Sequence, residues 1–403
     1  MTENKRDSIQ RKAVKKWIDN GKVGTCEIIT GLGKTFIALH CLSSMPINDK
    51  IHLFLAETTN RKKDLIDDII KYDNIFGTNL LDDYKLRFYC YQTVYKWKDR
   101  NFGLVICDEI HDQLSPSYVR FHENNSYDAI LGLSATITRN TKYEDENGKY
   151  FTKGALLNKY CPVIFKYSVN QAQIDETSRK LNVNVISHSL DEKEKNIVSG
   201  SKKNPFMQTE KAAYDYWNKE FAKAFYIDND DVRDFKIRIA SHKRSNILYN
   251  LKSKVPVVKE LLKLLPDKTI IFGNSIDALL EVTPNVVSSR NKEDVNDNIR
   301  RQFEKGDINV IGSFKKLKQG ANLSGLDNCI IMSYYSTEKD LIQRLGRLRI
   351  NADKVGTVFI IVTKNTKEQD WYDKMFEGID VFDIKEFSSV QHYVDYSNNI
   401  KKS

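Results

Sequence analysis

The sequence lacks the features that mark several classes of protein. No apolar run approaches membrane-spanning length, and the polar segment from Met1 to Lys12 lacks the apolar core of a signal peptide. The six cysteines form no C-x-x-C pair and the histidines show no ligand-like spacing, so neither a zinc site nor a disulfide framework is indicated. We therefore expect a cytoplasmic protein without a membrane partner or a structural metal.

The composition is that of a folded, mildly basic protein. Of its 403 residues, 40% are hydrophobic and 29% are charged, and this length suits two or three domains. The net charge of +9 suits a polyanionic partner, although many proteins carry a similar charge. No acidic cluster typical of a nuclease is present, which argues against cleavage of nucleic acid.

Strand-like and helix-like runs alternate along the chain and predict an α/β fold. The first set of strands covers residues 26–30, 51–57, 86–91, 104–108, 129–134 and 163–167. The second set covers 181–186, 269–272, 285–287, 309–313, 328–332 and 357–362. Strands this apolar must be covered on both faces, which predicts parallel sheets between layers of helices. We expect one lobe over 1–168, a second over 169–376 with a basic helical insertion over about 191–254, and a tail over 377–403.

The most informative segment lies between the first strand and the helix that follows it. It reads Thr30, Gly31, Leu32, Gly33, Lys34 and Thr35. Glycines let the backbone pass close to a polyphosphate, so that successive N–H groups can point at its oxygens. Lys34 can reach the β and γ phosphates, and the hydroxyl of Thr35 can bind Mg²⁺. The segment departs from the full P-loop pattern at Ile28, where a glycine is usual.

A second segment places carboxylates at the end of a strand. The run Val105 to Cys107 is followed by Asp108 and Glu109, and such strand ends are where α/β proteins bind ligands. Asp108 can hold Mg²⁺, while Glu109 can orient and deprotonate a water molecule. Another strand ends nearby in the sequence Ser134, Ala135 and Thr136.

A third segment is rich in arginine, with Gln343, Arg344, Arg347 and Arg349 close together. An arginine directed at the γ-phosphate stabilises the charge of phosphoryl transfer.

These segments together resemble the conserved motifs of superfamily 2 helicases. The run Thr30 to Thr35 is similar to motif I, Asp108 to His111 to a DEAH-type motif II, Ser134 to Thr136 to motif III, and Gln343 to Arg347 to motif VI. The resemblance implies two RecA-like lobes in tandem, ATP and Mg²⁺ as cofactors, and a nucleic-acid-dependent ATPase as the activity.

The resemblance also implies roles for individual residues. It assigns catalysis to Glu109, Gln343, Arg344 and Arg347. It assigns ATP binding to Gln10, Thr30, Gly31, Leu32, Gly33, Lys34, Thr35 and Gly320, and Mg²⁺ binding to Thr35 and Asp108. It assigns coupling to His111, Ser134 and Thr136, and contacts with nucleic acid to Thr58, Arg61, Thr93, Asn274, Lys315 and Lys316.

Within the superfamily, the chain looks most like phage helicases of the UvsW type and their XPB and RecG relatives. This likeness implies a monomeric DNA helicase or translocase that remodels branched DNA, located in the host cytoplasm if the protein comes from a phage. One departure is Ile350, which stands where the family usually carries the last arginine of motif VI. An RNA-directed helicase and an ATPase-impaired nucleic-acid-binding scaffold remain the alternatives.

One aromatic stripe has two interpretations. Tyr216, Trp217, Phe221 and Phe225 fall largely on one helical face within the insertion. They could stack on bases, but this spacing is more typical of a helix core, which we predict.

Overall fold

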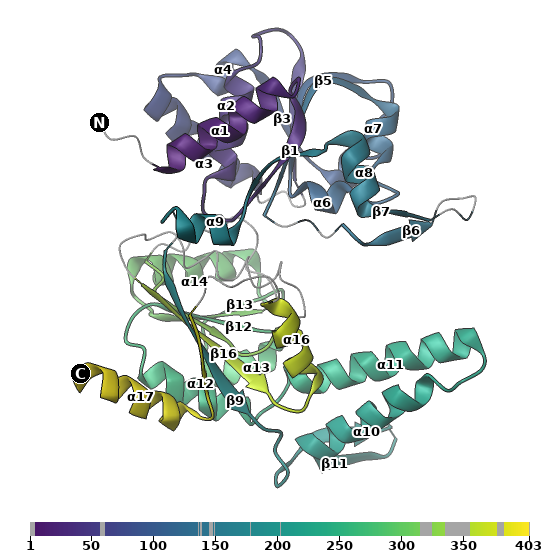
Figure 1. The fold of residues 1–403 in the computed structure, drawn as a ribbon, viewed down its shortest axis with the longest axis vertical. Coiled ribbons are helices and arrows are strands. Elements are labelled where there is room, and N and C mark those ends of the chain that lie inside the picture. Colours follow the sequence, from purple (N-terminus) through teal and green to yellow (C-terminus); the bar gives the residue numbers. More distant parts are fainter. Residues whose placement is uncertain are drawn as a thin grey trace. The chain divides into compact units, whose positions relative to one another are not determined.

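The computed structural model describes residues 5–56, 61–135, 137, 139–144, 148, 150–177, 179–201, 203–314, 325–334, 355–376 and 383–402. The chain forms two compact units, Met1–Ser178 and Arg179–Ser403 (Figure 1). Among the described residues, no helix is both long enough and apolar enough to cross a membrane.

Unit 1 is built on a parallel six-stranded sheet in the order β3-β2-β4-β5-β1-β8. Its strands are β1 (Val23–Ile28), β2 (Ile51–Ala56), β3 (Lys85–Cys90), β4 (Asn101–Asp108), β5 (Ser126–Ser134) and β8 (Val163–Tyr167). All six match strands predicted from the sequence. The central strands are buried on both faces, as their apolar runs require.

Helices cover both faces of this sheet. They are α1 (Lys5–Asp19), α2 (Lys34–Ser43), α3 (Arg61–Phe76), α4 (Leu80–Asp83), α5 (Tyr91–Val94), α6 (Ile110–Gln113), α7 (Arg120–Asn124), α8 (Lys153–Tyr160) and α9 (Val169–Ile174). Figure 1 shows α1, α2 and α3 on one face and α6, α7 and α8 on the other. A short hairpin of β6 (Lys142–Glu144) and β7 (Tyr150–Thr152) precedes α8. Helix α9 belongs to unit 1, although its residues follow the lobe boundary expected at residue 168.

Unit 2 repeats the plan with a parallel seven-stranded sheet in the order β13-β14-β12-β15-β16-β9-β17. Its strands are β9 (Leu181–His188), β12 (Thr269–Gly273), β13 (Val286–Val287), β14 (Val310–Phe314), β15 (Asn328–Ile331), β16 (Gly356–Thr363) and β17 (Ile384–Phe387). Its helices include α12 (Lys254–Lys263), α13 (Ile276–Val282), α14 (Glu293–Lys305), α16 (Lys367–Met375) and α17 (Val390–Lys402). The six strands predicted for this lobe are present. Strand β17 was not predicted, and it adds part of the expected tail to the sheet edge.

The insertion of unit 2 forms an arm, which we define as residues 195–249. It begins with a hairpin of β10 (Lys195–Gly200) and β11 (Pro205–Thr209) and continues as α10 (Glu210–Ala224) and α11 (Asp230–Tyr249). Figure 1 shows α10 and α11 running side by side away from the sheet. The expected helical insertion is therefore helical only after a β-hairpin.

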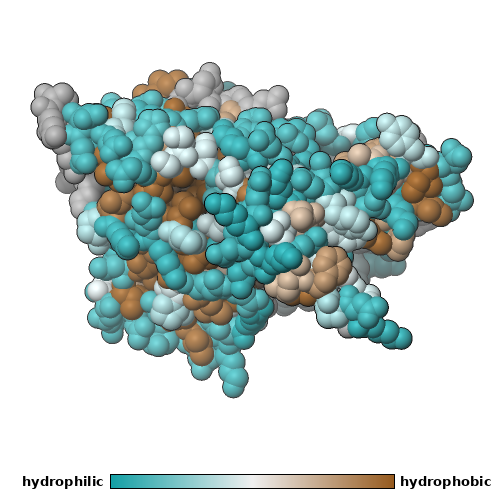
Figure 2. All heavy atoms as spheres, turned by 90° about the horizontal axis from the view of Figure 1, so that it is seen from below, coloured by the Kyte–Doolittle hydropathy of each residue, from teal (hydrophilic) through white to brown (hydrophobic). Residues whose placement is uncertain are grey.

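The prediction of a buried aromatic stripe on α10 is wrong for two of its members. Tyr216 is 53% and Phe225 is 55% exposed. Helix α10 packs against α11 and buries Ala213, Tyr214 and Ala224, and a two-helix layer has too few neighbours to cover a second face. Figure 2, which views unit 2 from below, shows apolar side chains lying among hydrophilic ones on the projecting arm.

Candidate nucleotide-binding site

The loop between β1 and α2 has the backbone shape that phosphate binding requires. Gly31 and Gly33 take φ angles of 88° and 86°, in the left-handed region that favours glycine. Gly33 caps α2, whose N-terminus receives no side-chain cap. Backbone N–H groups at such a helix start attract anions. The loop therefore fits the phosphates of a nucleotide, as its sequence predicts.

Gln10 lies on α1 and supports this loop. Its side chain is buried, and Nε2 donates a hydrogen bond of 2.8 Å to the carbonyl oxygen of Leu32. A Cβ atom on Gly33 would stand 2.6 Å from that Nε2. The φ angle of Gly33 therefore favours glycine, and a side chain there would also displace the end of Gln10. The predicted adenine contact of Gln10 stays a prediction.

The structure brings motifs I, II and III together. Lys34 Nζ lies 2.7 Å from Glu109 Oε1, and both side chains are largely buried. Ser134 Oγ donates to Glu109 Oε2 at 3.2 Å and lies 2.7 Å from His111 Nδ1. One carboxylate thus contacts the lysine of the loop and the hydroxyl of the last residue of β5.

Backbone strain helps to aim Glu109. Its φ angle is 53°, a left-handed conformation that is uncommon for a residue with a side chain. Such strain persists only where the surroundings enforce it, and it concentrates at functional sites. The turn places Glu109 at the start of α6, immediately after the strand that ends in Asp108. The position suits a residue that acts on water beside a bound phosphate.

Thr35 and Asp108 fit the oxygen ligands that Mg²⁺ prefers. A hydroxyl and a carboxylate supply part of a coordination shell, and bound phosphates usually supply more. The described residues contain no group of three or more histidine, cysteine, aspartate or glutamate side chains that could hold a metal by themselves. A Mg²⁺ ion here would therefore arrive with the nucleotide.

Three supporting residues were not predicted in their roles. Buried Glu27 on β1 accepts hydrogen bonds from the N–H of Ile137 at 3.2 Å and from Arg139 Nη2 at 2.6 Å. Glu27 therefore ties the segment after motif III to the strand that leads into the phosphate loop. A charged residue inside the apolar run 26–29 was the signal available in the sequence.

The other two act on motif II through its backbone. The Tyr91 hydroxyl donates to the carbonyl of Asp108 at 2.5 Å, and Lys153 Nζ donates to the carbonyl of His111 at 2.9 Å. Burial raises the pKa of Tyr91 well above its usual value and lowers the pKa of Lys153. No local pattern marks either contact, because the partners are backbone atoms of distant residues.

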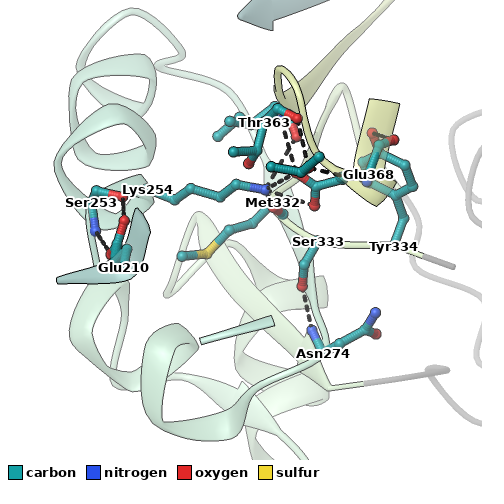
Figure 3. Close-up of polar contacts among 11 residues, drawn as sticks. Glu210, Ser253, Lys254, Asn274, Met332, Ser333, Tyr334, Thr363 and Glu368 are labelled. Atoms are coloured by element: carbon teal, nitrogen blue, oxygen red, sulfur yellow. Dashed lines mark hydrogen bonds and ion pairs between the residues drawn. The ribbon is translucent and has the colours of Figure 1, made fainter. Parts of the chain in front are cut away.

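The predicted nucleic-acid contacts are described only in part. Thr93 lies exposed on α5. Asn274 follows β12 and is buried, its N–H donates to Ser333 Oγ at 2.7 Å, and its side-chain amide has no hydrogen-bond partner in the structure (Figure 3). Only the backbone of Arg61 is described, as the first residue of α3. The remaining predicted site residues lie outside the described residues: Thr58, Thr136, Lys315, Lys316, Gly320, Gln343, Arg344 and Arg347.

Comparisons with known proteins agree with this site. Residues 4–139 match the family described as type III restriction enzyme, res subunit, and residues 253–351 match the helicase conserved C-terminal domain. The chain is 25% identical over 370 residues to the DNA 3'-5' translocase XPB2 of Sulfurisphaera tokodaii. The match covers 89% of this chain and 82% of that protein.

Solved structures share the fold at low sequence identity. The Hef helicase domain of Pyrococcus furiosus matches with a TM-score of 0.52 and 14% identity, over 91% of this chain and 96% of that one. Dbp5 of S. cerevisiae, bound to RNA and ADP BeF3, matches with a TM-score of 0.61 and 11% identity, over 98% of this chain and 92% of that one.

The two sheets, with a phosphate loop on the first, define a two-lobe motor ATPase. Helicase family models match parts of both lobes, and the chain is a nucleic-acid-dependent ATPase with the fold of superfamily 2 helicases.

Proposed function

We propose that the protein is an ATP-driven translocase or helicase that acts on DNA and remodels forked or branched structures. The observation that carries this proposal is the contact of Lys34, Glu109 and Ser134, which join three motifs of an ATPase site. The likeness to a DNA 3'-5' translocase over most of the chain supports DNA as the polymer. We propose that it works as a monomer.

The geometry suggests how the site operates. In this structure Glu109 has the ammonium of Lys34 as its partner at 2.7 Å. Phosphates in the loop would attract that ammonium, and Glu109 would then be available to accept a proton from water. Mg²⁺, held by Thr35 and Asp108, would neutralise charge on the phosphates. We propose that Arg344 and Arg347 add positive charge during phosphoryl transfer, and that Gln343, which is neutral, acts in catalysis beside them.

Ser134 and His111 are suited to report the state of this site. Both contact Glu109, with Ser134 Oγ at 3.2 Å and His111 Nδ1 at 3.4 Å from Oε2. A change in the partner of Glu109 therefore changes the hydrogen bonds of the segment after β5. We propose that this coupling converts hydrolysis into movement. Lys34 and Glu109 lie together in the positions that we propose for ATP hydrolysis, which argues against a scaffold with an impaired ATPase.

The deciding experiment measures ATP hydrolysis in the presence of single-stranded DNA, duplex, fork, four-way junction and RNA at matched nucleotide concentration. We expect DNA to stimulate hydrolysis, with the fork or junction most effective. Unwinding of labelled forks should accompany the stimulation. Stimulation by RNA alone would replace DNA with RNA as the polymer, because the same fold is found in a protein bound to RNA.

A further inference from the structure

A cavity of about 560 Å³ lies within unit 2, at the base of the arm. The arm lines one wall with Tyr214, Asn218 and Arg244. The opposite wall is formed by the turn after β16 and the start of α16, residues 364–367, 369 and 370. Within the described part of the chain, no predicted ATP-binding or nucleic-acid-binding residue lines it.

The charge of this lining is positive. Arg244, Lys364 and Lys367 face one acidic group, Asp370, which pairs with Lys367 at 2.9 Å. Lys364 has a looser partner, Glu386, at 3.5 Å. Among the described residues, no carboxylate forms an ion pair with Arg244. The cavity therefore holds more positive than negative charge, which favours an anion.

Arg244 provides an independent indication of a ligand. It is only 6% exposed, and its Nε atom has no hydrogen-bond partner among the residues that the structure describes. Its Nη1 atom donates to Asn218 Oδ1 at 2.7 Å, and its guanidinium lies 4.0 Å from the centre of the Phe221 ring. A buried charge with a neutral amide and a ring as neighbours is costly unless an anion compensates it.

The wall opposite Arg244 is suited to the same kind of ligand. Thr366 caps α16, so the positive end of the helix dipole lies at the cavity. Asn365 takes a φ of 57°, a left-handed turn that carries Lys364 and Lys367 to the same cavity. The N–H of Lys367 donates to the hydroxyl of Tyr214 at 2.6 Å, which joins this wall to the arm.

A buried ion pair anchors the start of α16, which forms one wall of the cavity, to α12. Lys254 Nζ lies 2.8 Å and 2.7 Å from the two oxygens of Glu368 and donates to the carbonyl of Met332 at 2.9 Å. Glu368 also accepts the N–H of Thr363 at 2.8 Å. Figure 3 shows these contacts converging from α12, β16 and α16. These contacts fix the wall at α16, and the hydrogen bond from Lys367 to Tyr214 joins that wall to the arm.

We infer that this cavity binds a backbone phosphate of a nucleic-acid strand, which the protein's proposed action on DNA would bring to it. The cavity has more room than one phosphate needs, which suits a phosphate with its sugars attached. Residues 195–249, the arm, carry eleven basic and seven acidic side chains, so the arm that forms one wall has a net positive charge. Asn274 and the turn after β16 follow strands of the same parallel sheet, so both lie at its carboxyl edge.

The test measures the binding of a labelled single-stranded DNA by fluorescence anisotropy over a range of salt concentrations, without ATP. The variant Lys364→Ala/Lys367→Ala should bind several-fold more weakly, and its log–log salt slope should be smaller by about one. The control Lys259→Ala/Lys263→Ala removes the same charge from exposed positions on α12 and should bind like wild type. Lys364→Arg/Lys367→Arg keeps the charge and should keep the slope.

The outcomes separate this inference from the proposed function. A wild-type protein that binds no DNA would overturn both. A wild-type protein that binds DNA, with equal slopes in all variants, would overturn only the phosphate site. Inorganic phosphate could stabilise the wild-type protein thermally but not Lys364→Ala/Lys367→Ala, while DNA binding stays unchanged in that variant. This result would assign the cavity to a free phosphate and also overturn the inference. Weak binding by the alanine variant that the arginine variant restores would support it.

Discussion

Lys34 Nζ and Glu109 Oε1 lie 2.7 Å apart although 75 positions separate the two residues in the chain. Strand β5 pairs with both β1 and β4, so the carboxyl ends of the three parallel strands lie close together. The same ammonium that neutralises Glu109 is the cation aimed at a nucleotide's phosphates. If Lys34 binds the phosphates as we propose, binding of ATP and release of Glu109 are linked through this one side chain.

Lys34→Ala should abolish ATP hydrolysis while leaving binding of nucleic acid largely intact. The change removes the lysine of the phosphate loop, the cation expected to reach the β and γ phosphates. Phosphate release and DNA binding should be measured on the same preparation. Lys50→Ala, which alters an exposed lysine paired with Asp128, is the matched control and should keep wild-type turnover. Wild-type turnover by Lys34→Ala would remove the loop from the ATP site.

Glu109→Gln should bind ATP but hydrolyse it about 10²- to 10⁴-fold more slowly, because the amide keeps the shape and loses the base. The amide can still accept from Ser134, so the local structure should persist. A fluorescent ATP analogue measures binding, and single-turnover assays measure the chemical step. If hydrolysis continues at the normal rate, another group activates the water.

Arg347→Ala should lower the hydrolysis rate by about 10³-fold or more if this arginine stabilises the charge of phosphoryl transfer. Arg347 lies outside the described residues, so this prediction comes from the sequence. ATP affinity must be measured beside turnover, since a loss explained wholly by weaker binding would exclude Arg347 from catalysis. Arg349→Ala is the companion variant, and a large rate loss there would indicate that Arg349 replaces the arginine missing at Ile350.

Lys254→Met should destabilise the protein by about 3–5 kcal/mol, because Glu368 would remain buried without its cation. Burial lowers the pKa of Lys254, while Glu368 opposes that shift. Lys254→Met/Glu368→Leu should recover most of the loss, since neither charge is then buried. Urea unfolding measures both variants. Lys252→Met, at a nearby exposed lysine, should change the free energy of unfolding by less than about 0.5 kcal/mol.

Acid should destabilise unit 1 through His122, whose pKa burial lowers from 6.5 to about 4. Between these values the unfolded chain binds a proton that the folded chain does not. The stability is therefore complete above pH 6.5 and is lost as the pH falls towards 4. From pH 7 to 5 the loss from this group is about 2 kcal/mol.

Chemical unfolding at a series of pH values checks this expectation. His122→Gln should show a shallower decline in the free energy of unfolding over that range. His392→Gln, which changes an exposed histidine, should keep the wild-type pH dependence. An unchanged profile in His122→Gln would show that His122 does not contribute to acid destabilisation.

The sequence by itself determined the architecture, and it predicted the residues of the ATPase site. Runs such as 104–107 are apolar enough to require cover on both faces, which predicts parallel sheets without knowledge of any contact. Gly31, Gly33 and Lys34 predict a phosphate loop, because these neighbouring residues supply the backbone freedom and the cation without help from distant residues. Asp108 and Glu109 could be predicted as site residues for the same reason, since they stand directly at the end of a buried strand.

Only the tertiary structure decided which distant groups meet. Nothing near Glu368 in the sequence indicates Lys254 as its partner, and nothing near Arg244 indicates the turn at Asn365. Strand β17 was missed because it is a short edge strand with charged Lys385 and Glu386 between its apolar ends. Such features depend on packing between distant parts of the chain, because burial sets the energy of a charge. The periodicity of the sequence does not show which distant residues pack together.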